Sequence, residues 1–134
     1  MPAEYKIDTA RRLVLTVGSG VVTMADLQGH QERLRQDPEF EPRFSQLLDF
    51  TGVTKLEFGA NDVRQLALKP IFSSTSRRAV LTTNDEAFRF ARLFETLRHV
   101  WGERGIRVFR DRGEALDWIR TTDERPGRTR QSPN

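Results

Sequence analysis

Few side chains in this sequence have the types and spacing that catalysis or metal binding requires. His30 and His99 are the only histidines, and they fall in different predicted helices, so no HxxxH or HExxH pair exists. The absence of cysteine excludes thiol chemistry, disulfides and cysteine-ligated metals. Ser19 lies between two glycines, but the segment lacks the lysine and spacing of a phosphate loop, and no general base is identifiable nearby. The pattern therefore predicts a protein without enzymatic activity, metal site or cofactor.

A hydroxyl-rich loop followed by two arginines is the first candidate binding site. Ser73 and Ser74 stand in the segment FSSTSRRAV, and Arg77 and Arg78 follow in the same segment. Hydroxyl groups together with guanidinium groups can bind a carboxylate or a phosphate. The alternative is a polar loop that leads into the next strand.

The start of the second predicted helix is the other candidate. The helix after LLDFTGV begins in the segment GAND, where Gly59 offers no side-chain acceptor as a cap and Asp62 stands three residues later. The first amides of this helix could then remain open to an anion. In the alternative, Asn61 is the cap and the helix begins one or two residues later. The candidate site for a protein partner or a small anionic ligand comprises Phe58, Gly59, Asn61 and Asp62.

Aromatic residues along the longest predicted helix, residues 85–101, belong to a wide apolar arc. At about 100° per residue, Phe90, Phe94 and Trp101 share this arc, and Phe88 falls outside it. Such an arc packs against neighbouring helices, forms a surface for a partner or lines an apolar pocket. The candidate apolar face comprises Phe88, Phe90, Phe94 and Trp101, and it could support a homodimer.

Alternating strands and helices must position these candidate sites. The alternation predicts an α/β fold with a mostly parallel sheet of about five strands, about four helices and an antiparallel first strand. Gly18 to Gly20 is predicted as a turn, and Thr23, Thr83 and Asp111 are predicted helix caps because an acid follows each by three residues. The predicted strands are 4–7, 12–18, 45–50, 77–83 and 106–111, and the predicted helices are 23–36, 61–68, 85–101 and 113–120.

Length and charge limit the remaining classes of protein. The 134 residues suit one domain, predicted over 1–121, and residues 122–134 have no apolar side chain and are predicted to be a disordered polar tail. The net charge is +3 and bases alternate with acids, which does not predict a nucleic-acid surface. Neither a signal-like N-terminus nor an apolar run of about 20 residues is present, so a soluble cytoplasmic protein without a membrane span is expected.

Three stretches of the chain resemble SpoIIAA-like domains, which are bacterial domains related to the STAS and Sec14-type folds. They are RRLVLTVGSGVVTMADLQGHQERLRQDPEFEPRFSQLLDFTGV, SRRAVLTTNDEAFRFARLFE and IRVFRDRGEALDWI. The resemblance covers nearly the whole chain except the tail, and it implies a compact α/β domain similar to uncharacterised members. Sporulation-type relatives carry a phosphorylatable serine after the central strand, where this chain has Glu57, Phe58 and Gly59. No hydroxyl stands there, so a serine phospho-switch is not carried over.

These observations lead to one hypothesis and one alternative. The chain is expected to be a non-enzymatic binding or regulatory domain that contacts a protein or a small anionic ligand, without a serine phospho-switch. The alternative is a carrier of an apolar or lipid-like ligand that uses the aromatic face of the long helix.

Overall fold

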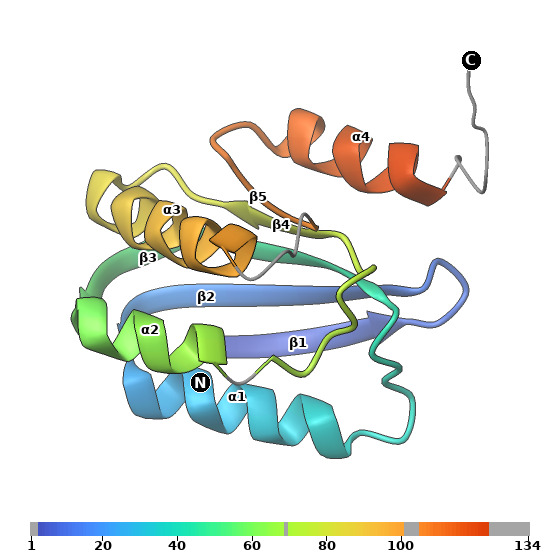
Figure 1. The fold of residues 1–134 in the computed structure, drawn as a ribbon, viewed down its shortest axis with the longest axis horizontal. Coiled ribbons are helices and arrows are strands. Elements are labelled where there is room, and N and C mark those ends of the chain that lie inside the picture. Colours follow the sequence, from blue (N-terminus) through green and yellow to red (C-terminus); the bar gives the residue numbers. More distant parts are fainter. Residues whose placement is uncertain (1–2, 69, 101–104, 124–134) are drawn as a thin grey trace.

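A five-stranded sheet carries three helices on one face and one helix on the other (Figure 1). This computed structural model describes residues 3–68, 70–100 and 105–123. The strands are β1 (Ala3–Asp8), β2 (Leu13–Thr23), β3 (Ser45–Glu57), β4 (Arg78–Leu81) and β5 (Ile106–Phe109). The helices are α1 (Met24–Gln36), α2 (Ala60–Leu68), α3 (Asp85–Val100) and α4 (Arg112–Asp123).

The strands stand in the sheet in the order of the sequence, β1-β2-β3-β4-β5. β1 pairs with β2 antiparallel, and the other neighbouring pairs are parallel. Right-handed crossovers that all advance in one direction put their helices on the same face of a sheet. α1, α2 and α3 therefore share one face, and α4 covers the opposite face. Within the described residues, this confirms the predicted α/β fold.

Strand residues alternate between the two faces, so each face has its own core. The face under α4 holds one cluster of buried residues, made of Leu13, Leu47, Ala79, Leu81, Ala115 and Ile119. The face under α1, α2 and α3 holds two separate clusters. The first is Val14, Leu34, Phe44 and Phe72, and the second is Val22, Val53, Leu56 and Ala87. The face with three helices is therefore not filled by one continuous core.

β2 and β3 are longer than the sequence pattern predicts. The predicted turn at 18–20 is wrong, because β2 continues through it to Thr23 with shifts in its pairing to β3. β3 continues past the predicted end at residue 50 to Glu57. The two strands continue because each supplies hydrogen-bond partners to the other. Gly20 has a φ of 64°, which glycine adopts readily, and it lies where the pairing is irregular. Gly18 and Gly20 suggest the end of a strand in the sequence. In the structure they lie inside β2, where it runs beside β3.

Two of the three predicted helix caps are present. Thr23 and Asp26 form the reciprocal bonds of a capping box at the start of α1, at 3.1 and 2.8 Å. Asp111 accepts the amide of the third residue of α4 at 2.9 Å. The predicted cap at Thr83 is wrong, because the side-chain oxygen of Asn84 accepts an amide of the first turn of α3 at 3.1 Å. Asn84 directly precedes the helix and therefore takes the capping position.

The predicted boundary between domain and tail falls inside α4. The helix runs to Asp123, whereas the domain is predicted to end at residue 121 and the polar tail to span 122–134. Residues 124–134 lie outside the residues that the structure describes.

Leu47 should contribute strongly to stability through the core under α4, where its side chain is 1% exposed. Leu47→Ala should lower the free energy of unfolding by about 2–5 kcal/mol because it removes buried contacts and leaves a cavity. Leu68→Ala is the matched control, because Leu68 is 51% exposed, and it should cost about 0.5 kcal/mol or less. Chemical denaturation measures both values, and equal losses would contradict this placement of Leu47.

Candidate functional site

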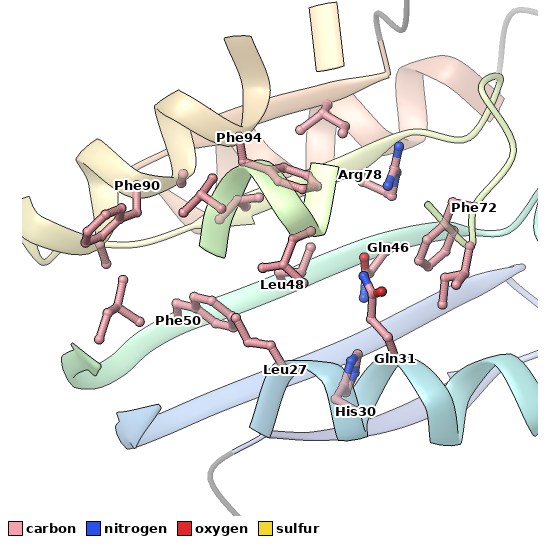
Figure 2. A pocket seen from close by; sticks show the side chains of 18 of the residues that line it. Leu27, His30, Gln31, Gln46, Leu48, Phe50, Phe72, Arg78, Phe90 and Phe94 are labelled. Atoms are coloured by element: carbon pink, nitrogen blue, oxygen red, sulfur yellow. The ribbon is translucent and has the colours of Figure 1, made fainter. Parts of the chain in front are cut away.

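A cavity of about 120 Å³ lies over β3 and β4, between α1 and α3 (Figure 2). Side chains from these two helices, from α2 and from the sheet line it. These include Leu27 and His30 of α1, Phe90 and Phe94 of α3, Leu48 and Phe50 of β3, and Val63 and Leu66 of α2. Every described residue that lines the cavity is apolar, apart from His30, Gln31, Gln46 and Arg78.

The cavity exists because α2 packs against α3 and leaves a gap beside α1. The guanidinium of Arg98 on α3 donates a hydrogen bond of 2.5 Å to the carbonyl of Ala67 near the end of α2. The described residues of α1 and α2 make no comparable packing. Leu48 and Phe50 belong to a central strand, yet they remain partly exposed. The floor of the cavity is therefore apolar surface that the helices cover only in part.

A glycine on β2 leaves room for the ring of Phe50. A Cβ atom at Gly18 would lie 2.8 Å from Cδ1 of Phe50, which is closer than real side chains approach. The ring occupies space that any other residue at this position would need. Gly18 therefore helps to set the shape of the cavity floor.

A buried chain of hydrogen bonds borders the apolar space. Oγ1 of Thr16 lies 3.0 Å from Nε2 of His30 and accepts a hydrogen bond of 2.9 Å from Nε2 of Gln46. The Thr16 hydroxyl can donate its proton to Nε2 of His30 when the neutral ring carries its proton on Nδ1, and it can accept one from Nε2 in the other tautomer. Burial, and then the charge of Arg33, lower the pKa of His30 to about 4. The His30 ring is therefore uncharged at pH 7.

Arg78 gives the cavity a positive group. Its side chain is 5% exposed and lies on the same side of the sheet as Gln46, its neighbour in register on β3 (Figure 2). The guanidinium lies over the ring of Phe72, 5.1 Å from the ring centroid. No acidic side chain is among the described residues that line the cavity. The site thus combines apolar walls with one cation.

A second hollow of about 420 Å³ adjoins the cavity between α1 and the end of α2. The two hollows share Gln31, Leu66 and Ile71. The other residues of this outer hollow are mostly polar, and they are Met24, Gln28, Glu32, Arg35, Gln65 and Pro70. A ligand could therefore enter the cavity between α1 and α2.

The predicted site at the start of α2 has its own internal partners. The amide of Gly59 donates a hydrogen bond of 3.0 Å to the carboxylate of Asp62, so a negative group already lies beside the first turn. Asn61 is exposed and accepts a hydrogen bond from within its own helix. Phe58 turns inward, with its ring 5.5 Å from that of Phe90, and lines the cavity. Of these four candidates, Phe58 alone belongs to the pocket.

The two arginines of the other predicted site lie on opposite faces of the sheet. Arg78 lines the cavity, whereas the guanidinium of Arg77 lies over Trp118 of α4, 4.6 Å from the ring centroid. The hydroxyl of Ser73 accepts an amide of its own loop at 3.2 Å, and Ser74 is exposed. The structure does not bring these candidates together around one point.

The aromatic residues of α3 divide between the pocket and the surface. Phe90 and Phe94 line the cavity, so this part of the predicted apolar face lies inside the domain. Phe88 is partly exposed, and the guanidinium of Arg110 lies 4.1 Å from its ring centroid. Trp101 lies outside the described residues.

Several residues of the pocket, and Thr16 in the hydrogen-bonded chain beside it, are not among the residues predicted from the sequence. Thr16 and Gln46 are polar residues in the apolar runs LVLTV and SQLLDF. Strands of a parallel sheet are buried on both faces, so a polar residue inside such a run is a signal that could have found them. Leu48 and Phe50 carry no comparable signal, because apolar residues are ordinary in a strand.

The described part of the chain has neither a cluster of metal-ligating side chains nor a helix able to span a membrane. No three His, Cys, Asp or Glu side chains in this part of the chain gather as metal ligands would. No helix within residues 3–68, 70–100 and 105–123 combines the length and apolar character needed to cross a bilayer.

Comparison with solved structures supports the fold. An uncharacterized protein from the DUF3478 family with a SpoIIAA-like fold, from Shewanella loihica PV-4, is similar over 87% of this chain and 91% of its own. The TM-score is 0.56 and the sequence identity is 21%. This likeness confirms the predicted SpoIIAA-like fold. No protein-family model matches the chain, and no curated protein does.

His30 should make the stability of the protein depend on pH. Its pKa falls from an ordinary value of 6.5 to about 4 in the folded protein, so the unfolded chain binds a proton more readily between these values. Stability is therefore full above about pH 6.5 and should be about 2 kcal/mol lower at pH 5 than at pH 7 from this group. Urea unfolding at both pH values should show that His30→Gln removes this component and that His99→Gln, the control, retains it. The same pH dependence in all three proteins would contradict a neutral, buried His30.

Proposed function

We propose that this protein is a non-enzymatic binding domain that holds a small apolar ligand in the cavity between α1 and α3. One observation carries the proposal: Leu48 and Phe50, on a central strand, form a floor that the helices leave partly exposed. Apolar surface in contact with water costs about 25 cal/mol per Å² relative to buried surface. A ligand that covers these side chains would recover that free energy.

The size of the cavity limits the ligand. Its volume of about 120 Å³ is comparable with that of an engineered apolar cavity of about 150 Å³ that binds benzene. Typical pockets for drug-sized molecules are larger, at about 300–1,000 Å³. The cavity therefore suits a single ring or a short branched chain. A longer ligand would have to extend into the outer hollow of about 420 Å³.

This proposal develops the apolar-ligand alternative in preference to an anion site at the start of α2. The carboxylate of Asp62 beside the first turn disfavours a second negative group there. The segment Glu57-Phe58-Gly59 offers no hydroxyl to phosphorylate, so the proposal includes no serine switch.

The proposed role of the hydrogen bonds that join Gln46, Thr16 and His30 is to hold these side chains in position. Thr16 is the hydroxyl next to His30, but it is fully buried and is not among the residues that line the cavity. A nucleophile must reach the reacting atom of a bound molecule. We therefore assign Thr16 and His30 to holding Gln46 and α1 in place.

Toluene should bind the wild-type protein and shift the two-dimensional NMR signals of residues that line the cavity. Ala91 of α3 is one of these residues, and Ala91→Phe should fill the space and weaken toluene binding by about tenfold or more. Ala25→Phe is the matched control, because Ala25 is exposed on α1 and lines neither hollow. This variant should bind toluene as the wild type does.

Two outcomes of this titration would rule out the cavity as the binding site. One is a wild-type protein without saturable shifts. The other is an Ala91→Phe protein that binds toluene as tightly as the wild type does. Near-ultraviolet circular dichroism of each variant checks that its tertiary packing is retained.

A further inference from the structure

We propose, building on the proposed function above, that the ligand carries one uncharged hydroxyl group on its apolar body, as a phenol does. The hydroxyl lies between the side-chain amides of Gln31 and Gln46, and the ring covers Leu48 on the floor of the cavity. Gln31 belongs to α1 and Gln46 to β3, and both residues line the cavity.

Gln46 turns a hydrogen-bond acceptor toward the cavity. Its amide nitrogen donates a hydrogen bond of 2.9 Å to Oγ1 of Thr16. Its amide oxygen accepts no hydrogen bond from the described residues, and this oxygen is not sealed from water. Because the side chain lines the cavity and is only 4% exposed, the oxygen opens into the cavity. A buried carbonyl oxygen without a donor costs free energy, which a donating ligand would recover.

Gln31 faces Gln46 across this space. Its side chain projects from α1 toward the amide of Gln46 on β3 (Figure 2). Within the described residues, no hydrogen bond joins the two amides directly. Gln31 also lines the outer hollow, so it stands where a ligand would enter. A group that donates to one amide and accepts from the other would fit between them, and a hydroxyl does both.

The two amides are uncharged, which selects a neutral group over an ion. No described residue that lines the cavity is acidic, so an ammonium group would have no counter-ion there. Arg78 already interacts with another group of the protein, and His30 is neutral at pH 7. Burial of an unpaired ion costs far more free energy than burial of a hydroxyl that makes its hydrogen bonds. The site therefore suits a hydroxyl better than a carboxylate or an ammonium group.

The spacing of side chains along β3 matches a ligand of one ring. Gln46, Leu48 and Phe50 all line the cavity, because alternate residues of a strand point to the same face. Each step of two residues spans about 7 Å along the strand. A hydroxyl beside Gln46 thus places a single aromatic ring over Leu48 and against Phe50. Phe94 lines the same space from α3 (Figure 2).

Toluene and phenol are a matched pair of test compounds, because they have nearly the same shape and differ by a methyl or a hydroxyl group on the ring. NMR titration of the wild type should give a dissociation constant for phenol that is no higher than that for toluene. Without hydrogen-bond partners in the cavity, the hydroxyl should instead weaken binding by about tenfold, because its lost bonds to water are not replaced.

Gln31→Leu should weaken phenol binding by about fivefold or more, which corresponds to the loss of one hydrogen bond. It should not weaken toluene binding, because toluene makes no hydrogen bond to the amide. Gln28→Leu is the matched control, because Gln28 also lies on α1 but lines only the outer hollow. This control should bind both compounds as the wild type does.

The outcomes separate this proposal from the one on which it rests. A wild type that binds toluene more tightly than phenol, or a Gln31→Leu protein that binds phenol as tightly as the wild type, would overturn the hydroxyl site and leave an apolar-ligand domain. Failure of both compounds to bind would overturn the proposed function itself.

A second measurement needs no variant and reports on Gln46 directly. The side-chain N–H signals of Gln46 in the wild type should shift more at saturating phenol than at saturating toluene. The two rings affect neighbouring signals alike, so the difference reports the hydroxyl. Equal shifts with the two compounds would overturn the contact between the hydroxyl and Gln46.

Discussion

The architecture depends on one constraint: parallel strands that follow one another in sheet order place their crossover helices on the same face. Three helices then share that face, whereas α4 is the one described helix on the other. α2 packs against α3, where Arg98 donates a hydrogen bond to the carbonyl of Ala67, and a strip of β3 beside α1 stays partly exposed. Buried clusters form on both sides of this strip and do not merge across it. The position of the cavity therefore follows from the topology, and its chemistry follows from the side chains that β3 and β4 direct into it.

The polar groups beside this strip are hard to explain by stability alone. Thr16, Gln46 and Arg78 are buried, and buried polar groups cost free energy unless hydrogen bonds replace their water. Thr16 and Gln46 recover part of that cost through their bonds with each other and with His30. Well-packed apolar side chains of similar volume are often at least as stabilising. Functional sites are where natural proteins often depart from such local rules, and this departure lies beside the cavity.

The fold could be predicted because each strand and helix has its own local pattern, and alternation of the two leaves few topologies. The ends of β2 and β3 could not, because Gly18 and Gly20 suit a turn as well as an irregular strand, and only the partner strand decides between them. The pocket could be predicted only in fragments. Arg78 stands out by its charge, but the sequence groups it with Arg77, which the alternation of a strand sends to the opposite face. Thr16 and Gln46 are 30 residues apart and meet through the register of two strands.

The central proposal is that the partly exposed floor formed by Leu48 and Phe50 receives a ligand. Intermolecular nuclear Overhauser effects between toluene and the protein test this claim most directly, because they identify the protons that touch the ligand. We expect effects between the toluene ring and the methyl groups of Leu27 and Leu48. Effects confined to exposed side chains such as Val17 and Val21, or none at all at saturating toluene, would contradict it.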